Sequence, residues 1–166
     1  MAIIILASSF CTSDINENRE RFIIPLTNKN SYLSNIKNNV TGYNRVVAVA
    51  NDPTNFDMND ERANIHFQSL KMTGLLYKEE IILDNRNKKD YLSILNGADL
   101  ILLCGGKLVC QLQFFKEINL KEFIKNHKGL IIGASAGAMT LCEYMTDFPE
   151  YLHEIDDRNI DDYIIQ

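Results

Sequence analysis

The sequence predicts a three-layer α/β sandwich, in which helices cover both faces of a doubly wound, mostly parallel sheet. Two observations lead to this fold class. Five short apolar runs rich in Ile, Val and Leu recur along the 166 residues, and longer stretches with helical patterns separate them. Runs that are apolar throughout are typical of parallel strands buried on both faces. Right-handed crossovers between such strands place helices on both sides of the sheet.

The predicted strands and helices alternate along the chain. Strands are expected at 3–7, 45–50, 80–84, 99–104 and 130–133. Helices are expected at 31–39, 57–73, 88–96, 107–126 and 136–145. Gly74 directly follows the second of these helices, where glycine is a frequent C-cap. The first apolar run is brief and no positive residue precedes it, which favours a buried strand over a signal peptide.

The composition is that of an ordinary soluble globular protein, with 46% apolar and 23% charged residues. The length suits one domain, and we expect an α/β domain over 1–150 followed by an acidic tail over 151–166. The net charge of −5, without a basic cluster, argues against binding to nucleic acid or to anionic membranes. No apolar run is long enough to span a bilayer. Four cysteines without a C-x-x-C pair or a secretion signal predict reduced thiols and a cytoplasmic location.

The stretch Gly133-Ala134-Ser135-Ala136-Gly137 follows the fifth predicted strand. It is either a tight turn that needs small residues or a G-x-S-x-G nucleophile elbow. In an elbow the serine stands in a strained conformation between strand and helix, and glycines at 133 and 137 prevent collisions with the turn. The first helical turn then offers free N–H groups, including that of Ala136, to an oxyanion. Because a strand precedes and a helix follows, the sequence favours the elbow.

A glycine pair, Gly105-Gly106, follows the fourth predicted strand. Ligands of such sheets bind beyond the carboxyl ends of the strands, so we expect this turn to lie close to Ser135. An N–H group of the pair would form an oxyanion hole with that of Ala136, and a plain strand-to-helix turn is the alternative. A phosphate-binding loop is excluded, because Leu108 occupies the place of the Ser or Thr that binds magnesium. The sequence predicts no cofactor and no metal.

Three segments together resemble a known family. The letters GASAGA at 133–138 resemble the G-x-S-A-G-A elbow of the dipeptidase E and cyanophycinase family of serine peptidases. These enzymes share the flavodoxin-like fold of class I glutamine amidotransferases. The letters LCGGK at 103–107 resemble the family's Gly-Gly-Gly-Asn turn, with Cys104 and Lys107 in place of its first glycine and its asparagine. The letters TDFP at 146–149 resemble its acidic T-x-D-x-P stretch, and the resemblance covers most of 1–150.

The resemblance implies a serine peptidase that acts on small peptides. Ser135 would be the nucleophile, and the N–H groups of Gly105 or Gly106 and Ala136 would hold the oxyanion. Asp147 corresponds to the acidic member that orients a catalytic histidine. The better-known members prefer peptides with an N-terminal aspartate, or aspartyl-arginine polymers, and no residue of this chain decides between such substrates.

The sequence departs from the family pattern at the general base. In the family, the catalytic histidine follows the acidic residue in a Pro-His-aromatic context, and this sequence lacks that motif. We therefore expect a fold shortened at its C-terminus. His66 is expected to pack or lie at the surface, and His127 to act as a cation at a helix end. His153 alone follows Asp147, in the chain order Ser, Asp, His, and is the candidate base.

Three functions compete at this point. The first is a serine-peptidase-like hydrolase whose activity is weak or lost because its catalytic histidine is missing. The alternative is a non-catalytic binding or interaction module on the same fold. An amidotransferase is disfavoured, because its elbow carries a cysteine where this chain has Ser135. A shortened sheet would also leave an open edge beside the fifth strand, which predicts a homodimer formed through that edge.

Overall fold

A single parallel sheet forms the centre of the protein. The computed structural model describes residues 2–142, 145–146 and 164–165. The strands of the main sheet are β1 (Ile3–Ala7), β4 (Arg45–Val49), β5 (Glu79–Leu83), β6 (Leu100–Leu103) and β7 (Leu130–Ala134). Their order is β1-β7-β6-β4-β5, and each neighbouring pair is parallel. The predicted doubly wound α/β fold is confirmed.

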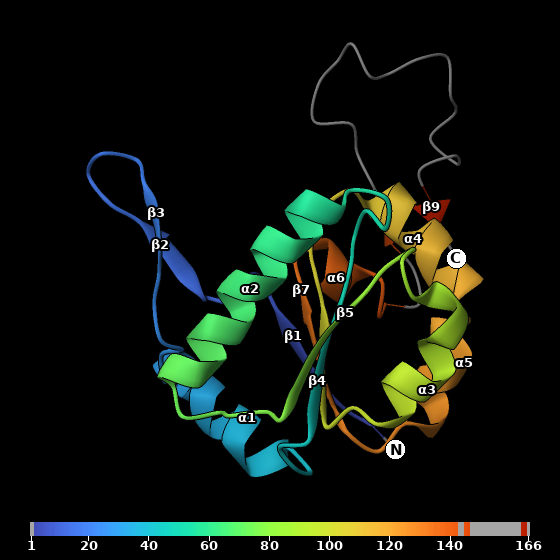
Figure 1. Cartoon of the computed structure of the whole chain (residues 1–166), viewed down its shortest axis with the longest axis horizontal. Coiled ribbons are helices and arrows are strands. Elements are labelled where there is room, and N and C mark those ends of the chain that lie inside the picture. Colours follow the sequence, from blue (N-terminus) through green and yellow to red (C-terminus); the bar gives the residue numbers. More distant parts are fainter. Residues whose placement is uncertain (1, 143–144, 147–163, 166) are drawn as a thin grey trace.

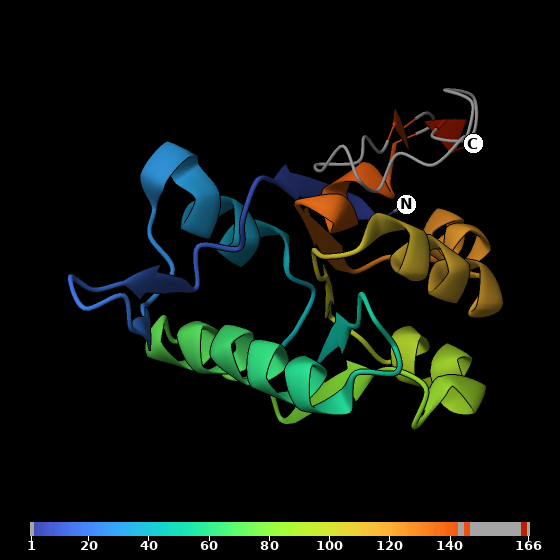
Figure 2. The ribbon, with the colours of Figure 1, turned by 90° about the horizontal axis from the view of Figure 1, so that it is seen from above.

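Helices cover the sheet on both faces, as Figures 1 and 2 show. The longer ones are α1 (Tyr32–Asn39), α2 (Phe56–Met72), α3 (Tyr91–Asn96), α4 (Leu108–Glu117) and α5 (Leu120–Asn126). Successive residues of a strand point to opposite faces. Val46 and Ala48 accordingly belong to the core under α1 and α2, whereas Val47 and Val49 belong to the core under α3, α4 and α5. The sheet is thus the middle of three layers. Within the described ranges, none of the helices is both long enough and apolar enough to cross a membrane.

The smaller elements lie outside this sandwich. They are the strands β2 (Ser13–Ile15) and β3 (Arg21–Ile23), the 3-10 helices η1 (Lys29–Ser31) and η2 (Lys88–Asp90), the helix α6 (Ala136–Met139), and the strands β8 (Met145–Thr146) and β9 (Ile164–Ile165). The β2–β3 hairpin, antiparallel and mostly exposed, projects from the body in Figure 1. The sequence did not predict it, because its strands are three residues long and carry no apolar run. The acidic segment 151–166 lies almost wholly outside the described residues, so the boundary at 150 stays a prediction.

Two predicted helices are shorter than expected. The helix predicted over 107–126 is interrupted, because Asn119 adopts a left-handed conformation (φ 46°) between α4 and α5, a conformation that asparagine tolerates better than most residues. The helix predicted over 136–145 ends at Met139. There the Thr140 hydroxyl donates to the carbonyl of Gly137 at 2.8 Å, and a turn follows up to Cys142.

The strand predicted at 3–7 is present as β1, but its predicted burial and the predicted open edge beside the fifth strand are wrong. The fifth predicted strand, β7, lies inside the sheet between β1 and β6, and β1 is the edge of the described sheet. The side chains of Ile3, Ile4 and Leu6 are 44%, 42% and 56% exposed, so β1 is not buried on both faces. An apolar run alone does not reveal this, because it is equally consistent with an edge position and a central one.

Candidate active site

Ser135 stands at the apex of a sharp turn between β7 and α6. Its backbone has φ 52° and ψ −124°, a combination that non-glycine residues avoid and that costs about 1–3 kcal/mol. Hydrogen bonds hold the residue there: its N–H donates to Ala7 O at 3.0 Å, and its carbonyl accepts from Ala138 N at 2.9 Å and Met139 N at 3.1 Å. The serine is exposed. Its hydroxyl makes no hydrogen bond to any residue that the structure describes, so it does not cap the helix.

The two glycines of the motif let α6 lie tightly against the ends of β6 and β7. A Cβ atom on Gly133 would lie 2.6 Å from the carbonyl oxygen of Gly137 and 2.9 Å from Cα of Ala138. A Cβ atom on Gly137 would collide with the carbonyl oxygen of Leu103. These neighbours are backbone atoms and have little freedom to move. The spacing G-x-S-x-G therefore follows from the contacts that the turn makes on both sides.

The Gly105-Gly106 turn lies beside Ser135. A Cβ atom on Gly105 would lie 2.9 Å from Cβ of Ser135 and 3.5 Å from its Oγ. The N–H groups of Gly105, Gly106 and Ala136 donate to no acceptor within the described ranges. The arrangement thus brings an exposed hydroxyl close to a turn with free backbone donors, and such donors are the groups from which oxyanion holes are built.

The remaining predicted triad members cannot be placed, because Asp147 and His153 lie outside the described residues. His66 lies in α2, where its Nδ1 is 2.8 Å from the hydroxyl oxygen of Thr12 and its ring meets Phe10 edge-on at 4.6 Å. Burial, with smaller contributions from Arg62 and Arg21, lowers the pKa of His66 to about 4. This half-buried histidine packs against Phe10 and Thr12 as a neutral ring.

His127 also packs, but not as the cation that the sequence predicts. It is the C-cap of α5, and its backbone N–H donates to the carbonyls of Phe123 and Ile124. The ring is 7% exposed and lies 4.9 Å from the ring of Phe123. Burial lowers the pKa of His127, so its imidazole is neutral at pH 7 and the backbone, not a positive charge, ends the helix.

Three side chains that the sequence analysis did not single out surround the glycine turn. Arg62 donates from Nη1 to the carbonyl oxygen of Gly105 at 3.3 Å and to Oδ1 of Asn51 at 3.2 Å. Gln111 donates to the carbonyl oxygen of Cys104. Asn51 lies two residues after the end of β4 and directly after the strand predicted over 45–50, so its position near a strand end was a usable signal. Arg62 lies within α2 among other polar residues, and Gln111 lies within the mostly apolar first part of α4, so nothing in the sequence marks either as a contact of the turn.

Cys104 is part of the core and not of the chemistry. Its side chain packs in the cluster under α1 and α2, and burial raises the pKa of its thiol to about 12. A neutral buried thiol is a poor nucleophile. The structure therefore agrees with the expectation that Cys104 packs as a small apolar residue.

A cavity lies at the opposite end of the sheet from Ser135. It has a volume of about 570 Å³, and residues at the amino ends of β6 and β7 line it, among them Asp99, His127 and Gly129. The carboxylate of Asp99 already has a hydrogen-bond partner there, because its Oδ2 accepts from the backbone N–H of Asn44 at 2.6 Å. Ligands of parallel α/β sheets bind at the carboxyl ends, and we therefore place the candidate site at Ser135. In the described part of the chain, no group of His, Cys, Asp and Glu side chains could hold a metal ion.

Fold and site together define a class of protein: an α/β domain with an exposed, strained serine between a strand and a helix, beside a glycine turn. A comparison with protein-family models identifies the family. The model of peptidase family S51 matches residues 57–159, more than half of the chain and including both turns. The chain belongs to this family, and its domain is that of a peptidase-like hydrolase. Comparison with curated proteins and with solved structures found no match.

Proposed function

We propose that the protein is a serine hydrolase that cleaves small peptides, as the dipeptidase E resemblance implies, with Ser135 as its nucleophile. One observation carries the proposal: the exposed, strained serine has a hydroxyl without a partner in the described residues and lies against a turn with unpaired N–H groups. Strain of this kind persists where the surrounding contacts impose it, and it is concentrated at active sites. Family membership supports the same chemistry.

In the proposed reaction Ser135 Oγ attacks the carbonyl carbon of the peptide bond. A base takes the hydroxyl proton, and the N–H groups of Gly105, Gly106 and Ala136 stabilise the negative oxygen. The base then gives the proton to the leaving amine, and water releases the acyl group. Asp147 and His153 are the proposed triad partners, in the chain order Ser, Asp, His.

A fluorophosphonate probe tests this proposal, because it labels only an activated serine. We expect labelling of the wild-type protein and none of Ser135→Ala. Ser8→Ala is the matched control, since Ser8 is another exposed serine at the end of a strand. Labelling that persists in Ser135→Ala would overturn the assignment of Ser135 as the nucleophile. Loss of labelling in His153→Ala supports that histidine as the base, and unchanged labelling dismisses it.

The second candidate is a binding module that uses the same turns without turnover. The observation that favours it is that the sequence lacks the Pro-His-aromatic motif that carries the family's catalytic histidine. A folded wild-type protein that is not labelled by the probe would support this candidate. The free thiols of Cys11, Cys104, Cys110 and Cys142 support the cytoplasm as the location of either function.

We also propose that the chain forms a homodimer through β1. The strand has apolar side chains exposed on both faces, and residues 2–8 carry no charge, whereas natural edge strands are usually protected by charges or prolines. We expect Ile4→Lys, which places a charge on this edge, to give the monomer mass in light scattering at concentrations where the wild-type protein gives the dimer mass. A wild-type mass that stays monomeric over a wide concentration range would contradict the dimer.

A further inference from the structure

The glycine turn after β6 is held by side chains from two different helices. Gln111 of α4, fully buried, donates to the carbonyl oxygen of Cys104. Arg62 of α2 donates to the carbonyl oxygen of Gly105 at 3.3 Å. The first two carbonyl groups of the turn are therefore both fixed. Glycine lacks a side chain that could restrict its backbone, so these contacts supply the restriction.

Fixing a carbonyl group also fixes the N–H group of the same peptide bond. The peptide unit is planar and trans, so its C=O and N–H point in opposite directions. The peptide bond between Gly105 and Gly106 holds its oxygen toward Arg62 and consequently directs the Gly106 N–H away from α2. That N–H has no acceptor among the residues described, and the preceding Gly105 lies against Ser135.

Asn51 strengthens the same contact. Its buried side chain fills the space that a Cβ atom on Gly106 would need, which is why only glycine fits there. Its Oδ1 also accepts from Nη1 of Arg62 at 3.2 Å. One guanidinium group thus joins the end of β4 to the turn after β6.

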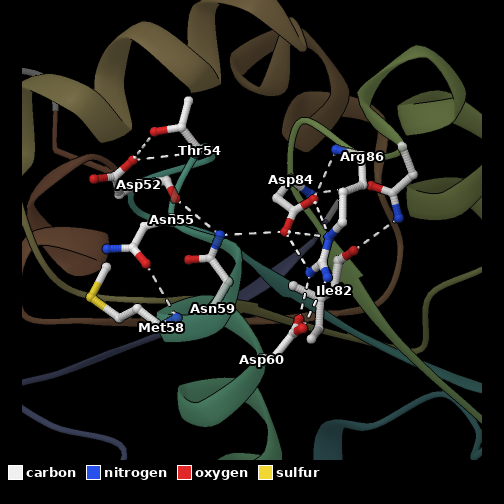
Figure 3. A network of polar contacts seen from close by, with 10 residues as sticks. Asp52, Thr54, Asn55, Met58, Asn59, Asp60, Ile82, Asp84 and Arg86 are labelled. Atoms are coloured by element: carbon white, nitrogen blue, oxygen red, sulfur yellow. Dashed lines mark hydrogen bonds and ion pairs between the residues drawn. The ribbon is translucent and has the colours of Figure 1, made fainter.

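The start of α2, which carries Arg62, is anchored at the carboxyl edge of the sheet. Asn59, one turn before Arg62, donates to the backbone carbonyl of Asp52 at 2.9 Å and to the buried carboxylate of Asp84 at 3.3 Å. Arg86 joins that carboxylate to Asp60 of α2, as Figure 3 shows. In contrast to Arg86, Arg62 forms no ion pair with any carboxylate of the described residues.

The geometry points to Arg62 as the positioning residue of the oxyanion hole: with Asn51 it holds the Gly105–Gly106 peptide so that the Gly106 N–H faces the reacting carbonyl oxygen. This inference rests on the proposed function. Arg62 touches the turn and not the reacting atoms. Its role is to keep a donor ready before the transition state forms, which is the condition under which such donors accelerate a reaction.

The rate of fluorophosphonate labelling of the full chain tests the inference. We expect Arg62→Ala to label roughly tenfold or more slowly than the wild-type protein, because loss of an oxyanion donor costs more than that in well-studied hydrolases. Added methylguanidine should restore part of the rate, which a merely structural role would not allow. Lys71→Ala is the matched control on the same helix; Lys71 pairs with Glu80, and its loss should leave the rate unchanged. Equal rates for Arg62→Ala and the wild-type protein would overturn the inference.

A second measurement separates this inference from the proposed function. In nitrogen-15 NMR spectra, the amide signals of Gly105 and Gly106 should shift or broaden in Arg62→Ala and return toward their wild-type positions with methylguanidine. This result is expected even if the wild-type protein is not labelled. Absence of labelling would overturn the proposed hydrolase activity, but not the role of Arg62 in holding the Gly105–Gly106 peptide. Unchanged glycine signals would overturn the role of Arg62 whatever the labelling shows. If Arg62→Ala does not fold, Arg62→Lys replaces it, since an ammonium group keeps the charge without the guanidinium fork, and the same outcomes apply.

Discussion

The two halves of the carboxyl edge of the sheet differ in whether their polar groups have hydrogen-bond partners. In the half formed by β4 and β5, the carboxylate of Asp84 is fully buried and accepts from the side chains of Arg86 and Asn59. In the half formed by β6 and β7, Ser135 is exposed and strained, and N–H groups around it have no acceptor among the described residues. We call these the paired half and the open half.

The paired half contributes to the stability of the fold, whereas the open half carries the candidate site. Buried polar groups are normally hydrogen-bonded, and an unmade bond costs free energy. The paired half follows this rule and fixes the start of α2. The open half departs from it where a substrate would supply the missing partners. The strain at Ser135 is held in place by the contacts around it, as the bond from its N–H to Ala7 illustrates.

The largest expected effect on stability lies in the paired half. We expect Asp84→Ala to lower the free energy of unfolding by about 3 kcal/mol, because the fully buried carboxylate accepts hydrogen bonds from the side chains of Asn59 and Arg86, and its loss leaves the buried Asn59 amide without one of its acceptors. Asp60→Ala is the matched control: it removes the exposed partner of the same Arg86 and should cost at most about 1 kcal/mol. Urea unfolding of both variants makes the comparison. Equal losses would mean that the two halves do not differ as described.

A smaller effect is expected for His66, which borders the open half. Burial lowers the pKa of His66 from 6.5 to about 4. The unfolded chain therefore binds a proton in this interval that the folded protein does not, and the free energy of unfolding falls as the pH decreases from about 6.5 to 4, by at most about 3 kcal/mol. His66→Gln can still bond to Thr12 but does not titrate, so its stability should depend less on pH. Parallel profiles of wild type and variant in denaturant unfolding would contradict this.

The smallest effect concerns the strain itself. Ser135→Gly should leave the free energy of unfolding unchanged or raise it by about 1 kcal/mol, because glycine adopts positive φ freely. Ser8→Gly, at an exposed position without positive φ, should instead lower it by up to about 1 kcal/mol, since glycine has more freedom in the unfolded chain. Thermal unfolding of the two variants measures the difference. If both lose the same stability, the open half stores no strain at Ser135.

Local patterns predicted most of the fold. The predicted strands at 3–7 and 130–133 and the helix at 57–73 match β1, β7 and α2 within one residue at either end. These segments are predictable because strand and helix periodicity are local properties. The glycines at 133 and 137 predicted the sharp turn between β7 and α6 for the same reason. The interruption of α4 and α5 at Asn119 was missed, because both sides of the break keep a helical pattern.

By itself the sequence determined the element order and the residues of the two turns. These follow from short-range backbone geometry and from the apolar pattern. Only the tertiary structure decided that β1 is the edge strand, that Arg62 and Asn51 meet the glycine turn, and that His127 is neutral. Strand order, contacts between distant segments and burial depend on long-range packing, and residues far apart along the chain carry no local mark of the partners they will meet.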